Sequence, residues 1–148
     1  MKTLALALSL SAAGLPSIAT AQQVRDCDTW EVSARNVDWS DPTRTFANGA
    51  IRLVALDTEE PAAASFHVMV TFPHPDDPFL DCRLISNTDG SGFSGISLSR
   101  ATADYDPARG LTVRVPAREA AAVHDTPLSL DITVDQAAGA VGVRFRPP

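Results

Sequence analysis

The stretch SFHVMVTFPHP at residues 65–75 contains the side chains best suited to metal chemistry in this sequence. His67, Met69 and His74 lie within eight positions of one another. Imidazole and thioether groups are both ligands that copper sites use. A mixed site would form if His74 folded back over the strand from the turn that begins at Pro73. These three residues are therefore the candidate metal ligands, with copper as the candidate ion.

The same stretch also has a structural interpretation, which the sequence favours. Its alternate positions carry large apolar side chains: Phe66, Val68, Val70 and Phe72. In an extended strand, His67 and Met69 share the opposite face. We expect that face to be partly wet, with methionine filling an irregular gap. Met69 is the one methionine after Met1, so the chain lacks a dense cluster of copper ligands.

No motif indicates catalysis. The sequence GFSGI at 92–96 lacks the fifth-position glycine of the nucleophile motif G-x-S-x-G and precedes an expected strand, where that motif requires a helix. Glycine-rich phosphate loops and the zinc motif H-E-x-x-H are absent from the sequence. The sequence favours a protein without enzymatic activity and without a cofactor. A hydrolase whose site is assembled from distant residues is the alternative.

Two aromatic residues are candidates for binding a partner. Trp39 lies outside the alternating segments and Tyr105 precedes a turn, and aromatic side chains are enriched where partners dock. Each also has a structural alternative, and we expect Trp39 to cover the core beneath a long loop. Trp30 shares its parity with Val32, so we expect it in the core.

Residues 1–21 have the features of a cleaved signal peptide. Lys2 is followed by the apolar run LALALSLSAAGL, and small residues at 19–21 precede Gln22. The apolar run is too short to cross a bilayer as a helix, so we expect no membrane span after cleavage. The sequence therefore predicts a periplasmic or secreted protein.

Two cysteines remain after this segment, Cys27 and Cys82. In the oxidising compartment that an exported chain enters, an even number of cysteines predicts a disulfide. The two residues lack the C-x-x-C spacing of redox and metal pairs. The sequence therefore predicts a Cys27–Cys82 bridge.

The charge of the chain argues against nucleic acid as a partner. Its formal net charge is −6, and every basic side chain after Lys2 is arginine. Scattered arginines on an acidic chain do not produce the concentrated positive field that a phosphate backbone or an anionic membrane surface requires. The expected partner is therefore another periplasmic or envelope protein.

Alternation of apolar and polar residues recurs along the chain and predicts strands. The expected strands cover 29–37, 50–56, 65–72, 79–86, 93–99, 111–115, 128–135 and 141–146. In the strand at 128–135 the even-numbered residues are expected to face the core. The sequence NTDGSG predicts a hairpin between 79–86 and 93–99, and YDPARG predicts a turn at 105–110. The segment 116–124, which starts with proline and is rich in alanine, predicts a short helical turn.

About seven to eight short strands separated by turns are typical of an all-β protein. We predict a single antiparallel β-sandwich, immunoglobulin-like in architecture, over residues 22–148, with a small β-barrel as the alternative. The preferred functional hypothesis is an exported, non-catalytic protein that binds or stabilises another envelope component, in an assembly, accessory or inhibitory role. A periplasmic copper-binding protein that uses His67, Met69 and His74 is the alternative.

Overall fold

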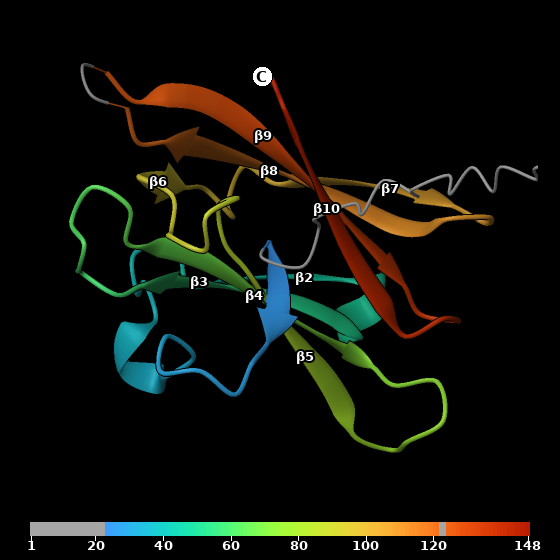
Figure 1. Ribbon diagram of the computed structural model, residues 1–148. Coiled ribbons are helices and arrows are strands. Elements are labelled where there is room, and N and C mark those ends of the chain that lie inside the picture. The colour runs from blue at the N-terminus through green and yellow to red at the C-terminus, as the bar shows by residue number, and fades with distance from the viewer. Residues whose placement is uncertain (1–22, 122–123) are drawn as a thin grey trace, which may run out of the picture.

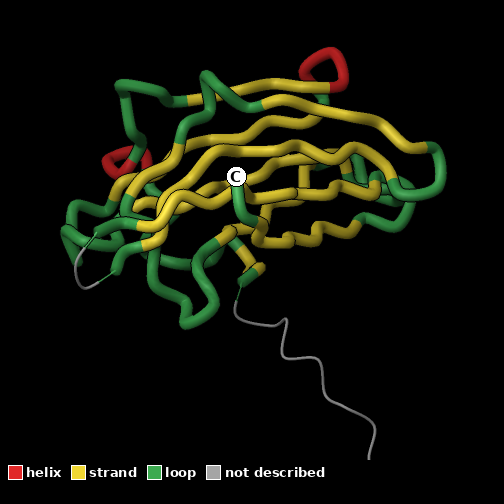
Figure 2. The backbone as a smooth tube through the Cα atoms, turned by 90° about the horizontal axis from the view of Figure 1, so that it is seen from above, coloured by secondary structure: helices red, strands yellow, loops and turns green. Residues whose placement is uncertain are grey.

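The computed structural model describes residues 23–121 and 124–148, so the expected signal peptide lies outside the described residues. The described chain forms two antiparallel sheets that pack face to face (Figure 1). The strands are β1 Val24–Asp26, β2 Thr43–Phe46, β3 Ile51–Asp57, β4 Phe66–Pro73, β5 Leu80–Ile85, β6 Gly95–Ile96, β7 Thr102–Asp106, β8 Gly110–Glu119, β9 Thr126–Asp135 and β10 Ala140–Arg146. Two 3-10 helices, η1 Ala34–Asn36 and η2 Ala47–Gly49, lie outside the strand layers (Figure 2).

Sheet 1 has the strand order β1-β5-β4-β3-β2, and sheet 2 has the order β10-β9-β8, with β6 and β7 both pairing with β8. The predicted sandwich is confirmed, and the barrel alternative is wrong because the strands form two separate sheets. Within each sheet the chain runs mainly as a meander. The resemblance to immunoglobulin domains is therefore one of layered architecture, because those domains use Greek-key connections.

The core lies between the two sheets and follows the alternation in the sequence. In β4, Val68, Val70 and Phe72 are fully buried, and Phe66 packs against the same cluster. The even-numbered residues of β9 face this core, as predicted: Leu128, Leu130, Ile132 and Val134. Phe93 and Phe145 meet edge to face in it, with ring centroids 5.6 Å apart. Apolar side chains of this size stabilise a fold by roughly 1.5–3 kcal/mol each when fully buried.

The strand expected at 29–37 is wrong. This segment is a loop that contains η1 and covers the outer face of sheet 1, where Val32 and Val37 pack against a second, smaller apolar cluster. The side chain of Asn36 donates hydrogen bonds to the backbone carbonyls of Trp30 and Glu31, which curls the backbone away from an extended course. The burial parity is reversed as well: Glu31 is 6% exposed, whereas Trp30 is 62% exposed.

The hairpin expected around NTDGSG is also wrong, because β5 belongs to sheet 1 and the following strand, β6, belongs to sheet 2. The connection crosses between the layers, and Phe93 forms an isolated bridge with Phe66 on the way. Gly92 allows this crossing, since a Cβ at that position would overlap the carbonyl oxygens of Ala64 and Phe66. Burial of Phe93 and Leu98 between the sheets outweighs the local turn preference.

The helical turn expected at 116–124 is wrong for 116–119, because β8 continues as a strand through Glu119. Pro116 lies opposite Ser129 of β9. On its other side, β6 ends opposite Ala117 and β7 begins opposite Arg114, so the ladder is interrupted where proline has no N–H to donate. Residues 122–123 of the expected turn lie outside the described residues.

The predicted disulfide between Cys27 and Cys82 is confirmed, with a Cα–Cα distance of 5.6 Å. It joins the end of β1 to β5 beside the register pair Asp26 and Arg83. Among residues 23–121 and 124–148, no helix has both the length and the apolar character needed to cross a membrane.

Candidate functional site

The residue His67 lies in a buried polar network under the loop that covers sheet 1. Its Nδ1 is 2.9 Å from the hydroxyl of Ser86, which is fully buried. Nη2 of Arg25 donates to the same hydroxyl at 3.2 Å and to a carboxylate oxygen of Glu31 at 3.0 Å. His67 is only 4% exposed, so the prediction of a partly wet strand face is wrong at this position. The network fastens β1 and the covering loop to β4 and β5.

The hydrogen-bond directions agree with a neutral imidazole. Because the Ser86 hydroxyl accepts from Arg25, its proton is available to donate to Nδ1 of His67. Burial lowers the pKa of His67, although the nearby Glu31 carboxylate opposes this. Burial alone would raise the pKa of Glu31, but hydrogen bonds from its own backbone and from Arg25 lower it overall. A serine, a histidine and a glutamate meet here, but a fully buried hydroxyl does not reach a substrate.

The three candidate metal ligands do not converge. Met69 packs against the small apolar cluster of Val54, Leu56 and Leu84. His74 follows the end of β4, where it accepts a hydrogen bond from the backbone of Asp76. Seven residues of extended strand separate it from His67, about 23 Å at 3.3 Å per residue. In the described part of the chain, no three His, Cys, Asp or Glu side chains are grouped as a metal ion requires.

The aromatic candidates lie on the surface. Trp39 is 75% exposed and Tyr105 is 65% exposed, so the expectation that Trp39 covers the core is wrong. Trp30, which was expected in the core, is also exposed. Trp39 follows η1 beside sheet 1, whereas Tyr105 belongs to β7 in sheet 2. The two candidates therefore belong to different layers of the sandwich.

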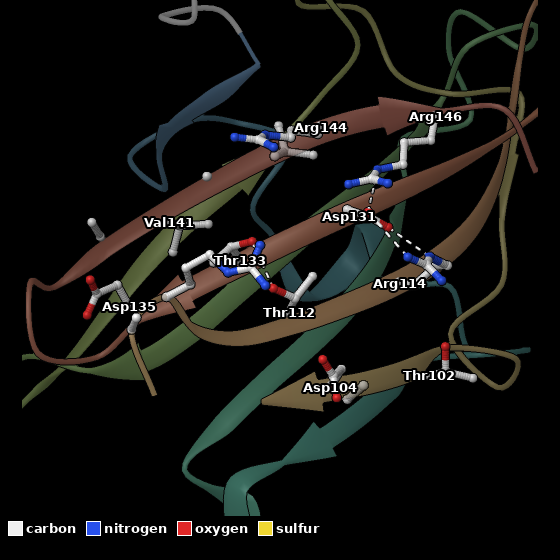
Figure 3. A pocket seen from close by; sticks show the side chains of 16 residues that line it. Thr102, Asp104, Thr112, Arg114, Asp131, Thr133, Asp135, Val141, Arg144 and Arg146 are labelled. Atoms are coloured by element: carbon white, nitrogen blue, oxygen red, sulfur yellow. Dashed lines mark hydrogen bonds and ion pairs between the residues drawn. The ribbon is translucent and has the colours of Figure 1, made fainter. Parts of the chain in front are cut away.

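A groove of about 680 Å³ crosses the outer face of sheet 2 (Figure 3). It is lined by outward-facing side chains of β7, β8, β9 and β10. In β9 these include Asp131, Thr133 and Asp135, which the alternation in the sequence predicts to face away from the core. Sequence reasoning placed these residues outward but did not identify the groove.

Two arginines pair with one carboxylate at one end of the groove, and a third arginine lies on the neighbouring strand. Nε of Arg114 donates a hydrogen bond to Asp131 at 2.9 Å, and Nε of Arg146 forms an ion pair with the other oxygen of Asp131 at 2.7 Å. Asp131 is only 4% exposed. The hydrogen bond to Asp131 raises the pKa of Arg114. Arg144 lies opposite Asp131 across the β9–β10 pair and forms no ion pair with any described residue. This arginine end therefore has an excess of two positive charges, with Nη groups available to an acceptor.

Small side chains form the middle of the groove. The hydroxyls of Thr112 and Thr133 are 3.1 Å apart and hydrogen-bonded across β8 and β9. Gly142 lies opposite Thr133 on β10, and a Cβ there would meet no atom within 4 Å. The space above Gly142 is thus open, and hydroxyl groups line its floor.

The other end and the β7 side of the groove are acidic. Asp135 lies four residues from Asp131 along β9, and Asp104 lies opposite Thr112. Among the described residues, neither carboxylate has an ion-pair partner. Arg109 also lines the groove, but it is paired with Asp106 at 2.9 Å. Asp135 at this end and Asp104 on the β7 side therefore give an excess of two negative charges.

Comparison of the chain with models of protein families, with curated proteins and with solved structures gave no match.

Proposed function

We propose that this protein is an exported, non-catalytic binding protein that holds another periplasmic or envelope component on the outer face of sheet 2. The observation that carries this proposal is the groove, in which Arg144, Asp104 and Asp135 present charges without an ion-pair partner among the described residues. Surface charges are commonly paired or dispersed, whereas here they gather around an open hollow floored by hydroxyl groups. Such an arrangement suits recognition of a polar partner.

The position of the groove favours binding over catalysis. Catalysis by the serine–histidine pair would need access to Ser86, and that hydroxyl is sealed beneath the covering loop. In the groove, threonine hydroxyls lie beside arginines whose guanidinium groups stay protonated and do not act as a base. The groove thus offers hydrogen bonds and charge but no activated nucleophile, and binding there requires no cofactor.

The Cys27–Cys82 bridge supports export, because disulfides persist in oxidising compartments. The groove carries the acidic side chains Asp131, Asp104 and Asp135 as well as arginines, and this mixture suits a protein partner better than a uniform phosphate backbone.

Capture from an envelope extract tests the proposal. The immobilised mature protein, its Arg144→Glu variant and its Arg52→Glu variant are compared. Arg52 is exposed on β3 of sheet 1, so its substitution changes the net charge equally without touching the groove. We expect a component that is retained by the wild type and by Arg52→Glu and is lost with Arg144→Glu. Identical capture by all three proteins, or turnover of ester, peptide or cell-wall substrates, would contradict the proposal.

A further inference from the structure

Charge in the groove is divided along one direction. The arginine end contains Arg114 and Arg146, which pair with Asp131, and the unpaired Arg144 on β10, whereas Asp135 lies at the other end of the same stretch of β9 (Figure 3). The four residues from Asp131 to Asp135 span about 13 Å of extended strand. The groove is therefore electrically bipolar, with its opposite charges at a defined separation.

This division selects against ligands of a single charge. A uniformly anionic chain would gain from the arginines but would be repelled by Asp104 and Asp135. A uniformly cationic chain would meet the reverse pattern. Like charges brought together oppose binding, so the charge pattern of the groove excludes partners of a single charge. A ligand that fits both ends carries one anionic and one cationic group.

We infer that the groove binds an extended segment of a partner protein in which one acidic and one basic side chain lie four residues apart. This inference rests on the proposed binding function and specifies its ligand. The acidic side chain accepts hydrogen bonds from the Nη groups of Arg144 and Arg146, and the basic side chain pairs with Asp135. Four residues of extended peptide cover the same distance as the four residues from Asp131 to Asp135.

The middle of the groove suits the peptide between these two anchors. Thr112 and Thr133 offer hydroxyl groups to its polar atoms, and the missing side chain at Gly142 leaves room for a backbone to approach. A second copy of this chain is a poorer occupant, because two grooves that face each other would enclose an empty space and their floors would not touch. An inserted strand-like segment fills the hollow.

Peptide titration followed by NMR of the 15N-labelled mature protein tests the inference. The probe is the peptide GETSTKG with blocked termini, in which Glu and Lys lie four residues apart. Control peptides carry Glu at both positions or Lys at both positions. We expect the mixed peptide to bind at least five-fold more tightly than either control. The amides of Thr112, Thr133 and Gly142 should shift during the titration.

Three variants locate the binding. Gly142→Val should abolish it, because the added side chain projects into open space above the strand and blocks the floor without disturbing the fold. Arg144→Gln should weaken it roughly five-fold, the upper range for an exposed ion pair. The matched control Arg52→Gln on sheet 1 should leave the affinity unchanged. Thermal unfolding of each variant verifies that the fold is retained.

Any of three results would overturn the inference: equal affinity for the mixed and single-charge peptides, unchanged affinity after Gly142→Val, or shifts confined to residues outside the groove. Sedimentation that shows a wild-type dimer, lost in Gly142→Val, would assign the groove to self-association instead. If the peptides fail while capture from the envelope still depends on Arg144, the ligand class is wrong and the proposed binding function stands. If that capture is also independent of Arg144, both are wrong.

Discussion

Removal of the Cys27–Cys82 bridge tests how the N-terminal segment is held on sheet 1. The double variant Cys27→Ala/Cys82→Ala opens a loop with a sequence separation of 55. In the chain-entropy model, a loop of this length stabilises the folded state by about 4 kcal/mol. A domain of about 125 residues has an unfolding entropy near 0.26 kcal/mol/K, so the expected fall in Tm is about 15 °C.

The structure also predicts where the effect is largest. Only three residue pairs join β1 to β5, and the bridge lies directly after the last of them, Asp26 with Arg83. Without the bridge, β1 and the loop through Val37 depend on this short ladder, on the partly buried Arg25–Glu31 pair and on the packing of Val32 and Val37. We therefore expect faster amide hydrogen exchange in residues 24–37 than in β4 or β9, under conditions where the protein remains folded.

Thermal melts followed by circular dichroism and hydrogen exchange followed by mass spectrometry provide the assays. The reduced wild-type protein is the control, and it should melt close to the double variant. A fall in Tm of less than about 5 °C, together with unchanged exchange in residues 24–37, would refute the reasoning. That result would mean that the polar network alone holds the segment in place.

Four further predictions concern the stability of the fold. Because burial lowers the pKa of His67, the unfolded chain binds more protons than the folded one below about pH 6.5, so the free energy of unfolding should decline from pH 7 to pH 5. Urea unfolding at several pH values should show a weaker decline for His67→Gln. An equal decline in both proteins would contradict the buried, neutral state of His67. Because the pKa of Glu31 is lowered in the folded state, its contribution to the free energy of unfolding should be lost only below about pH 4.5, and the same urea titrations should show this. Gly92→Ala should cost about 1–3 kcal/mol in denaturant unfolding, because its Cβ meets backbone, whereas Gly142→Ala should be nearly neutral; similar losses would refute the crowding argument. Phe72→Ala should cost about 3–5 kcal/mol, measured the same way, and a loss below 1 kcal/mol would place its ring outside the core.

Local alternation predicted the strands in which every second residue is a large apolar side chain. In 65–72 and 128–135 every second residue is apolar, and these residues form the core between the sheets. The same reasoning failed at 29–37, where the pattern has the right period. There, Glu31 is buried with its Oε1 paired to Nη2 of Arg25, a residue of β1 that lies outside the segment. A local alternation pattern does not show such a partner.

The connection between the sheets shows the same limit. NTDGSG has the residues of a hairpin turn, but a turn preference is small compared with the burial of Phe93 and Leu98 between two layers. Pro116 was a helix-start signal in the sequence, and in the fold it occupies the gap between two short neighbouring strands.

The sequence by itself determined a layered all-β protein with a disulfide between its two cysteines, because the two-residue alternation of apolar and polar side chains and the number of cysteines are properties of the chain. It also placed Asp131, Thr133 and Asp135 on an outward face. The tertiary structure alone decided which polar groups meet. Ser86 reaches His67 from 19 residues away, and Arg114 and Arg146 reach Asp131 from the two strands that flank β9. Strand order and register set these meetings, and both result from long-range packing that no local pattern encodes.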